Sequence, residues 1–320
     1  MRRHYAFNGD ADGLCALQQL RLTDPGDATL VTGIKRDIKL LGRVAAHCGD
    51  EVTVLDISLD SNREALLGLL DAGVRVRYFD HHFAGELPNH AGFEPHIDTA
   101  PDVCTSLLVD RHLGGRHRAW AIAAAFGDSL PEVGAAIAHA DGLDADTTGR
   151  LERLGIALNY NAYGERLSDL HFDPAALPQA MLPYEDPLHF AADSPVFARL
   201  WAGYEEDIAK ARAVEPHRRV PGAMLLVMPD EAWARRAIGA LANDLMHALS
   251  GSAIAILLPR SSGGYTVSVR VPKASTMGAD EFCRVFPTGG GRRGAAGVNE
   301  LPQASLGRFV DRFEASFARP

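Results

Sequence analysis

The chain has 320 residues, of which 47% are hydrophobic and 23% are charged, and its net charge is -9. This length and composition are ordinary for a soluble globular protein with two domains, and the negative charge argues against a protein that coats long duplex nucleic acid through a basic face. No apolar run could span a bilayer and no secretion signal opens the chain, so we expect a cytoplasmic protein without a membrane partner.

The first eighty residues alternate between predicted strands and helices with short turns. The predicted strands are His4 to Asn8, Ala28 to Thr32, Glu51 to Asp56 and Val74 to Phe79, and the predicted helices are Leu14 to Leu20, Asp37 to His47 and Asp60 to Asp71. Asp37, and then Asp60 or Ser61, are expected to cap the second and third helices. Regular alternation of this kind predicts a doubly wound parallel α/β sheet.

The pattern then becomes helical. Residues 102–140 are predicted to form helices interrupted at Gly127-Asp128-Ser129, and residues 141–193 a helical, loop-rich extension. A charged helix from Ser194 to Val214 is the expected linker. Beyond it, the sequence predicts a second, smaller α/β domain with strands at 223–228, 253–258 and 265–271 and helices at 231–249 and 305–317. The predicted domains are therefore 1–192 and 221–320, joined by the linker 193–220.

Acidic residues follow three of the predicted strands in the first domain. Asp10 and Asp12 follow the first strand, Asp56 ends the third, and Asp80-His81-His82 ends the fourth. Each cluster alone is readily explained as a solvated loop or turn, as is Gly127-Asp128. Together they indicate a site, because parallel strands deliver their carboxyl ends to one edge of a sheet.

The ligand types in these clusters favour two divalent ions. The set offers hard oxygen atoms and one imidazole from Asp10, Asp12, Asp56, His81 and Asp128, with one carboxylate shared between the ions. Such a set suits Mn²⁺ or Mg²⁺ better than Zn²⁺, which prefers more nitrogen or sulfur. Two adjacent ions can generate a hydroxide and stabilise displacement at phosphorus, so phosphoester hydrolysis is the predicted reaction class.

A glycine-rich stretch lies near the end of the second domain. Residues 288–297 contain Gly289, Gly290 and Gly291, followed by two arginines and a run of small residues. Such a loop can approach a phosphate closely and donate backbone N–H groups to it. The alternative is a flexible surface turn.

These residues resemble the motifs of the DHH phosphoesterases that carry the DHH-associated C-terminal domain, the group that includes RecJ-like and oligoribonuclease-like enzymes. The resemblance covers nearly the whole chain. It depends on Gly-Asp-Ala-Asp-Gly at 9–13, Asp56, Asp80-His81-His82, Gly127-Asp128 and the late glycine stretch. It implies the two-domain α/β fold and metal-dependent phosphodiesterase activity.

The resemblance also implies a role for each matching residue. It makes Asp10, Asp12, Asp56, His81 and Asp128 the ligands of two Mn²⁺ ions, with Asp56 as the bridge. It directs His82 at the scissile phosphate and makes Asp80 the residue that orients a histidine. In the second domain, Ser268-Val269-Arg270 resembles a strand that reaches the substrate, and the segment that begins with Gly289, Gly290, Gly291 and Arg292 resembles the substrate-holding loop.

Three positions depart from the family pattern. Ala6 stands where small-substrate members have a metal-binding histidine, and Asn8 where RecJ-type exonucleases have an acid. Asn8 is therefore a candidate ligand through its carbonyl oxygen. Arg292 stands where the loop generally has histidine.

The sequence leads to one favoured function and two alternatives. The favoured function is a Mn²⁺-dependent phosphodiesterase, with Mg²⁺ as an alternative ion, that releases mononucleotides from short oligonucleotides, linear dinucleotides or related small nucleotides. The first alternative is a RecJ-type single-strand exonuclease, disfavoured because this short, acidic chain contains no added oligonucleotide-binding barrel or aromatic and basic stacking stretch. The second is a catalytically degenerate nucleotide-binding protein. A homodimer is left open.

Overall fold

The computed structural model describes residues 1–249 and 251–319. The chain divides into two compact units, Met1–Gly203 and Tyr204–Pro320. The boundary falls within helix α9 (Pro195–Arg212), inside the segment for which the sequence predicts a linker. No described helix is both long enough and apolar enough to cross a membrane.

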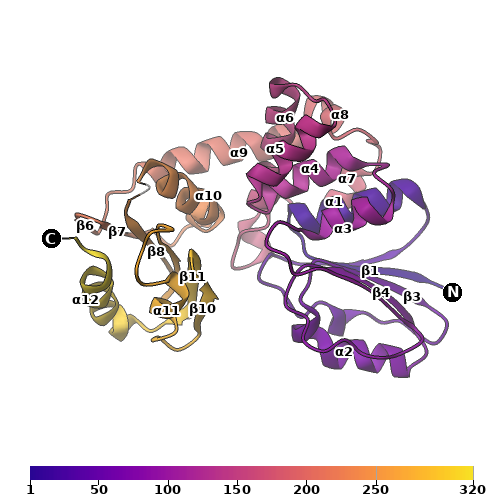
Figure 1. The fold of residues 1–320 in the computed structure, drawn as a ribbon, viewed down its shortest axis with the longest axis horizontal. Helices are drawn as coiled ribbons and strands as arrows, with labels where there is room; N and C mark the ends of the chain where they lie inside the picture. The colour runs from indigo at the N-terminus through magenta and orange to yellow at the C-terminus, as the bar shows by residue number, and fades with distance from the viewer. Residues whose placement is uncertain (250, 320) are drawn as a thin grey trace. The chain divides into compact units, whose positions relative to one another are not determined.

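The first unit is built on a five-stranded sheet in the order β2-β1-β3-β4-β5, and every neighbouring pair is parallel (Figure 1). The strands are β1 (Arg3–Phe7), β2 (Thr29–Val31), β3 (Glu51–Leu55), β4 (Arg75–Asp80) and β5 (Phe93–Ile97). β2 and β3 lie on opposite sides of β1, so the winding reverses there. Open α/β sheets bind ligands at the carboxyl ends of the strands beside such a reversal.

Helices cover both faces of this sheet, as the predicted doubly wound fold requires. On one face, α1 (Ala11–Thr23) and α3 (Thr105–His112) pack on side chains such as Phe7 and Phe79. On the other, α2 (Leu59–Asp71) packs on Val52, Val54 and Tyr78. Because successive strand residues point to opposite faces, the apolar β-branched and aromatic runs in these strands supply both cores.

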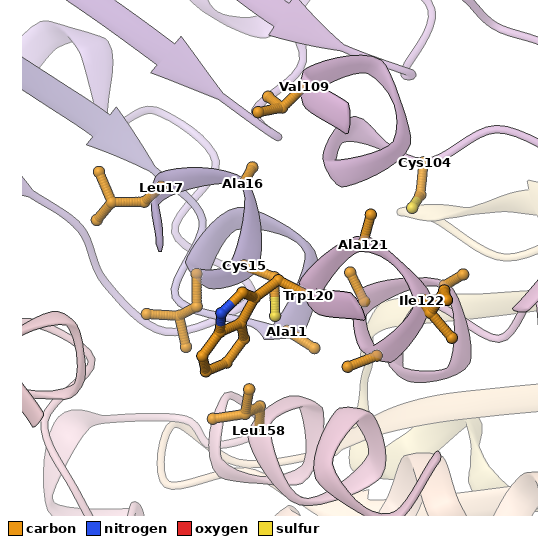
Figure 2. Close-up of a cluster of buried hydrophobic side chains, with 14 of the residues drawn as sticks. Ala11, Cys15, Ala16, Leu17, Cys104, Val109, Trp120, Ala121, Ile122 and Leu158 are labelled. Carbon is orange, nitrogen blue, oxygen red and sulfur yellow. The ribbon is translucent and has the colours of Figure 1, made fainter. Parts of the chain in front are cut away.

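A helical layer continues from α3. It consists of α4 (Arg118–Gly127), α5 (Pro131–Ala140), α6 (Ala145–Asn161), α7 (Leu177–Met181) and α8 (Pro187–Asp193). Trp120 of α4 is fully buried in one hydrophobic cluster with Ala11, Cys15 and Leu158 (Figure 2). Its indole N–H donates to the carbonyl oxygen of Glu185 at 2.8 Å, so the ring is both packed and hydrogen-bonded.

Two local predictions in this unit are wrong. Residues 37–47 form no helix beyond the 3₁₀ turn Leu41–Arg43, because the Asn62 side chain of α2 bonds to two backbone groups of the segment. Asn62 accepts from the Leu41 N–H at 3.2 Å and donates to the Ile38 carbonyl oxygen at 2.6 Å.

Helix α2 is capped by Ser58 instead of Asp60 or Ser61. Strand β5, which contains a proline, is absent from the sequence prediction.

The second unit contains a six-stranded mixed sheet in the order β10-β11-β9-β8-β7-β6, in which β7 and β8 are parallel and the other pairs antiparallel. Its strands are β6 (Arg218–Val220), β7 (Ala223–Val227), β8 (Ala253–Pro259), β9 (Tyr265–Arg270), β10 (Gly289–Arg292) and β11 (Ala295–Leu301). Its helices are α10 (Ala232–Ala248), α11 (Ala279–Cys283) and α12 (Leu306–Phe317). Phe282, Phe309, Phe313 and Phe317 pack together in its core.

Candidate metal centre

The first two acids of the site are fixed by helix N-termini. Asp10 is the N-cap of α1, and its Oδ1 accepts hydrogen bonds from the N–H groups of Asp12 and Gly13, each at 3.1 Å. The two carboxylate oxygens of Asp12 accept from the N–H groups of Thr105 and Ser106 at the start of α3, both at 2.7 Å. Helix N-termini stabilise negative charge, so backbone N–H groups hold both carboxylates in place.

His81 is aimed at three of the acids. Its Nδ1 donates to the carbonyl oxygen of Val103 at 2.9 Å, because a carbonyl can only accept. The ring then directs its Nε2 to the opposite side, where the oxygens of Asp56, Asp128 and Asp12 lie at 3.4, 3.7 and 4.0 Å. A metal-binding histidine typically donates its other N–H to a backbone carbonyl in this way.

Asp128 reaches this group because two glycines allow close helix packing. A Cβ atom on Gly127 would lie 2.5 Å from the Cβ of Ala11 and 2.7 Å from the carbonyl oxygen of Gly155. A Cβ on Gly155 would lie 1.9 Å from the carbonyl oxygen of Ala123. The absence of side chains at both positions lets α4 approach α1 and α6, and this places Asp128, which follows α4, beside the acids of α1.

Asp80 and His82 form a coupled pair at the end of β4. Asp80 is fully buried, and its Oδ1 accepts from the Nδ1–H of His82 at 2.7 Å and from the His82 backbone N–H at 3.2 Å. Its Oδ2 accepts from the N–H of Leu59 at 3.3 Å. Burial alone would lower the pKa of His82, but the hydrogen bond to Asp80 and its charge outweigh burial and raise that pKa. The His82 side chain is 45% exposed.

The clustered carboxylates shift one another's pKa values. Burial, followed by the charges of Asp10, Asp12 and Asp128, raises the pKa of Asp56 well above its usual range. Burial and the charge of Asp12 raise the pKa of Asp128 to about 6. Burial favours neutral Asp10, yet its ion pair with Lys35 outweighs burial and lowers its pKa. The group as a whole therefore favours an additional cation.

Lys35 is a site residue that the sequence motifs did not indicate. Its ammonium group pairs with Asp10, donates to Oδ1 of Asn159 at 3.2 Å and lies 5.5 Å from the centre of the Tyr163 ring. It lies four residues beyond β2. Its position shortly after a strand is the same sequence signal that indicates the acids.

The donor set fits divalent cations. Two overlapping groups have ligand atoms within 4.8 Å of one another: Asp12, His81 and Asp128, and Asp56, His81 and His82. Asn8 is 6% exposed, and its Oδ1 has no hydrogen-bond partner among the described residues. A buried amide oxygen without a partner is costly unless something coordinates it. Across both groups and Asn8, oxygen ligands outnumber imidazoles, and such a set suits Mn²⁺ or Mg²⁺.

Backbone strain marks the same segments. Three non-glycine residues in the described ranges have positive φ: Asp56 at 57°, Ser129 at 63° and Thr288 at 62°. Asp56 is itself a candidate ligand, Ser129 follows Asp128, and Thr288 precedes the glycine-rich stretch. Such conformations cost about 1 kcal/mol or more and concentrate at functional sites.

The remaining candidate residues lie in the second unit, on strand β9 and on the two strands that follow it in the sheet, β11 and β10. Ser268 and Arg270 are alternate residues of β9, and Nη1 of Arg270 donates to Oγ of Ser268 at 3.0 Å. The predicted glycine loop is in fact the hairpin of β10 and β11. In the strand register, Ser268 pairs with Gly297, which in turn pairs with Gly290. Arg270 likewise pairs with Ala295, which in turn pairs with Arg292.

The three consecutive glycines have different surroundings. A Cβ on Gly289 would lie 1.8 Å from the carbonyl oxygen of Cys283, and one on Gly291, at φ 138°, would lie 2.5 Å from Cα of Ala296. Packing therefore requires both glycines. A Cβ on Gly290 would have no atom within 4 Å, so packing does not explain why this position lacks a side chain.

No protein-family model and no curated protein matches the sequence. Solved structures do match. The chain is 20% identical to a manganese-bound exonuclease RecJ, with 98% of this chain and 89% of that chain covered and a TM-score of 0.63. This chain has the RecJ fold.

Two further solved structures have a similar fold. The pGpG-specific phosphodiesterase PggH from Vibrio cholerae is 16% identical, with 99% of this chain and 100% of that chain covered and a TM-score of 0.58. RecJ from Thermus thermophilus, in complex with Mn²⁺, is 19% identical with a TM-score of 0.55, and this chain spans 53% of its length. These neighbours confirm the predicted fold class.

Proposed function

We propose that this protein is a metal-dependent phosphodiesterase that hydrolyses short oligonucleotides, linear dinucleotides or related small nucleotides to mononucleotides in the cytoplasm. The observation that carries the proposal is the position of His81, whose Nε2 faces Asp12, Asp56 and Asp128 while its Nδ1 is held by the carbonyl oxygen of Val103. This arrangement is suited to binding divalent cations at a strand-end site.

The residues present fit two Mn²⁺ ions, with Mg²⁺ as the alternative. Asp12, His81 and Asp128 would hold one ion, and Asp10 and Asn8 would contribute to the other. Asp56, whose Oδ1 lies 3.4 Å from Nε2 of His81, would be the carboxylate shared between the two ions, as the resemblance implies. Bound metal would supply an activated water and stabilise charge on the phosphoryl oxygens.

His82 would contact the phosphate. Asp80 holds Nδ1 of His82, which leaves Nε2 as the atom available to donate a hydrogen bond to a phosphoryl oxygen. The raised pKa of His82 favours the imidazolium form that stabilises negative charge. Asp80 would then act by orienting His82, as the resemblance implies.

An exposed aromatic ring beside His82 favours nucleotides over substrates without a base. Phe83 is 73% exposed, yet its backbone is held: its carbonyl oxygen accepts from Oγ of Ser58 at 3.4 Å. Arg63 donates to the carbonyl oxygens of Ala84 and Glu86 in the same loop. An exposed ring on a backbone held in this way can stack on a nucleobase.

The second unit would bind a non-reacting part of the substrate. Arg270 and Arg292 offer planar groups that match phosphate oxygens. Ser268 adds a hydroxyl group, and the open position at Gly290 lets a ligand approach the backbone closely. Gly289 and Gly291 would support this surface by shaping the hairpin.

A RecJ-type exonuclease is the second candidate, supported by the fold shared with RecJ. The test is to incubate the protein with Mn²⁺ and a panel of dinucleotides, single strands of increasing length, bisphosphorylated adenosine and pyrophosphate. We expect turnover to be fastest for the shortest nucleotides. Faster cleavage of long single strands would favour the exonuclease, and binding without cleavage would identify a degenerate member.

A further inference from the structure

A second cluster of metal-binding side chains lies in the first unit, at its edge strand. Glu94 and His96 are alternate residues of β5, and His112 is the last residue of α3. Alternate strand residues share a face. One ligand atom from each of the three side chains lies within 4.8 Å of the other two, and Nε2 of His96 lies 2.7 Å from Oε1 of Glu94.

Aromatic packing holds the two imidazoles in this geometry. The His96 ring stacks on the buried ring of Phe79, with centroids 4.3 Å apart and planes 6° apart. The His112 ring packs edge-on against both, at 4.9 Å from His96 and 5.2 Å from Phe79. Both rings are therefore oriented before a ligand arrives, and orientation of this kind improves a metal site.

The third ligand is oriented by an arginine. Arg77 lies opposite Glu94 in the strand register, and its Nε donates to Oε2 of Glu94 at 3.2 Å. Oε1 of Glu94 is the oxygen directed at His96. Arg77 therefore fixes the carboxylate of Glu94 with Oε1 toward His96.

We propose that Glu94, His96 and His112 bind a Zn²⁺ ion. Two imidazole nitrogens and one carboxylate oxygen form a donor set typical of zinc, whereas the carboxylate-rich centre at Asp12 and Asp56 suits Mn²⁺ or Mg²⁺. Glu94 and His112 are exposed, so water can complete the coordination. This inference is independent of the phosphodiesterase proposal.

Zinc at this triad would tie together the two ends of a segment that supports the metal centre. The chain between β5 and α3 contains Val103, which holds His81, and it ends at Thr105, whose N–H donates to Asp12. Zn²⁺ binding is expected to restrain this segment. The two metal sites would then be linked through α3, whose first turn holds Asp12 and whose last residue is His112.

The test is isothermal titration of Zn²⁺ into protein saturated with Mn²⁺, comparing wild type with His112→Ala. His139→Ala, which removes an exposed histidine in the last turn of α5, is the matched control. We expect wild type and the control to bind one Zn²⁺ per chain more than His112→Ala. Equal stoichiometry in all three proteins would overturn the proposal, because exchange at the catalytic site affects all three equally.

Two further measurements test the Zn²⁺ site even if the alanine variant misfolds. Glu94→Gln preserves side-chain shape and is expected to weaken Zn²⁺ binding at least about tenfold. Co²⁺ in place of Zn²⁺ should give the visible absorption of a four-coordinate site in wild type and lose it in both variants. If Glu94→Gln leaves the affinity and the spectrum unchanged, the triad is a structural hydrogen-bonding cluster.

Discussion

Replacing Asp56 by asparagine removes the charge of this carboxylate and preserves its shape. Asparagine retains the oxygen that accepts from Oγ1 of Thr105 at 3.3 Å, and it tolerates the positive φ of 57° at this position. We expect Asp56→Asn to abolish Mn²⁺-dependent turnover, because a ligand shared by two ions affects both. We also expect the metal-free variant to be more stable than the metal-free wild type.

The size of this stabilisation follows from the geometry. Oδ1 of Asp56 and Oδ2 of Asp128 are 3.4 and 3.7 Å from one nitrogen of His81, so they lie at most about 7 Å apart. At an effective dielectric constant of about 20, two unit charges at that distance repel by roughly 2.4 kcal/mol. Because Asp56 avoids part of this repulsion by binding a proton, the expected gain is about 1 to 2 kcal/mol, or roughly 2 to 8 °C in Tm.

Thermal unfolding with chelator and with Mn²⁺, together with kcat, measures both effects. Asp193→Asn, which removes an exposed carboxylate at the end of α8, is the matched control and should resemble wild type. Asp56 would not be a metal ligand if the variant retained turnover and a Mn²⁺-dependent rise in Tm. A lower Tm of the metal-free variant would instead make the carboxylate a structural residue.

Four other substitutions test separate parts of the proposed site. The folded-state pKa of Asp128 is raised to about 6, so its contribution to the stability of the metal-free protein is present below about pH 4 and is lost as the pH rises to about 6. Asp128→Asn should remove this pH-dependent loss of unfolding free energy, measured by urea unfolding, and an unchanged pH dependence would contradict the assignment. Asn8→Asp should lower the Mn²⁺ concentration needed for half-maximal activity, since a carboxylate neutralises more charge than an amide, and an unchanged or higher requirement would place position 8 away from the metal. Arg292→Ala should raise KM roughly ten- to hundredfold with a smaller change in kcat, the loss of a charge-assisted hydrogen bond of about 1.5 to 3 kcal/mol, whereas an unchanged KM would make the glycine hairpin purely structural. Phe83→Ala should raise KM for dinucleotides but not for an abasic analogue, with Phe83→Trp retaining affinity, and equal effects on both substrates would exclude base stacking.

The parallel sheet and its acids could be predicted because a few local rules act together. Strand periodicity located β1, β3 and β4, and their carboxyl ends place Asp10, Asp56 and Asp80 at one edge of the sheet whatever the details of the loops. Asp128 is a candidate from the sequence, but it follows no strand, so no local rule places it at this edge. The packing that brings it to the site depends on Gly127 and Gly155, which belong to helices far apart in sequence.

The failures have a common physical cause, which is long-range hydrogen bonding and pairing. Residues 37–47 have helical spacing, but the Asn62 side chain bonds to the Leu41 N–H and the Ile38 carbonyl oxygen within them. The glycines at 289–291 suggest a loop, yet pairing with β11 makes them a strand. The cluster of Glu94, His96 and His112 could not be predicted from sequence, because it depends on β5 joining the sheet beside β4.

The proposed mechanism requires that the acids and His81 bind two metal ions. Anomalous diffraction at the manganese absorption edge, from crystals soaked in Mn²⁺, would locate those ions. We expect two adjacent Mn²⁺ peaks bounded by Asp12, Asp56, His81 and Asp128, roughly 3.5 to 4 Å apart. Absence of Mn²⁺ from these residues at millimolar concentration, with substrate analogue present, would contradict the mechanism.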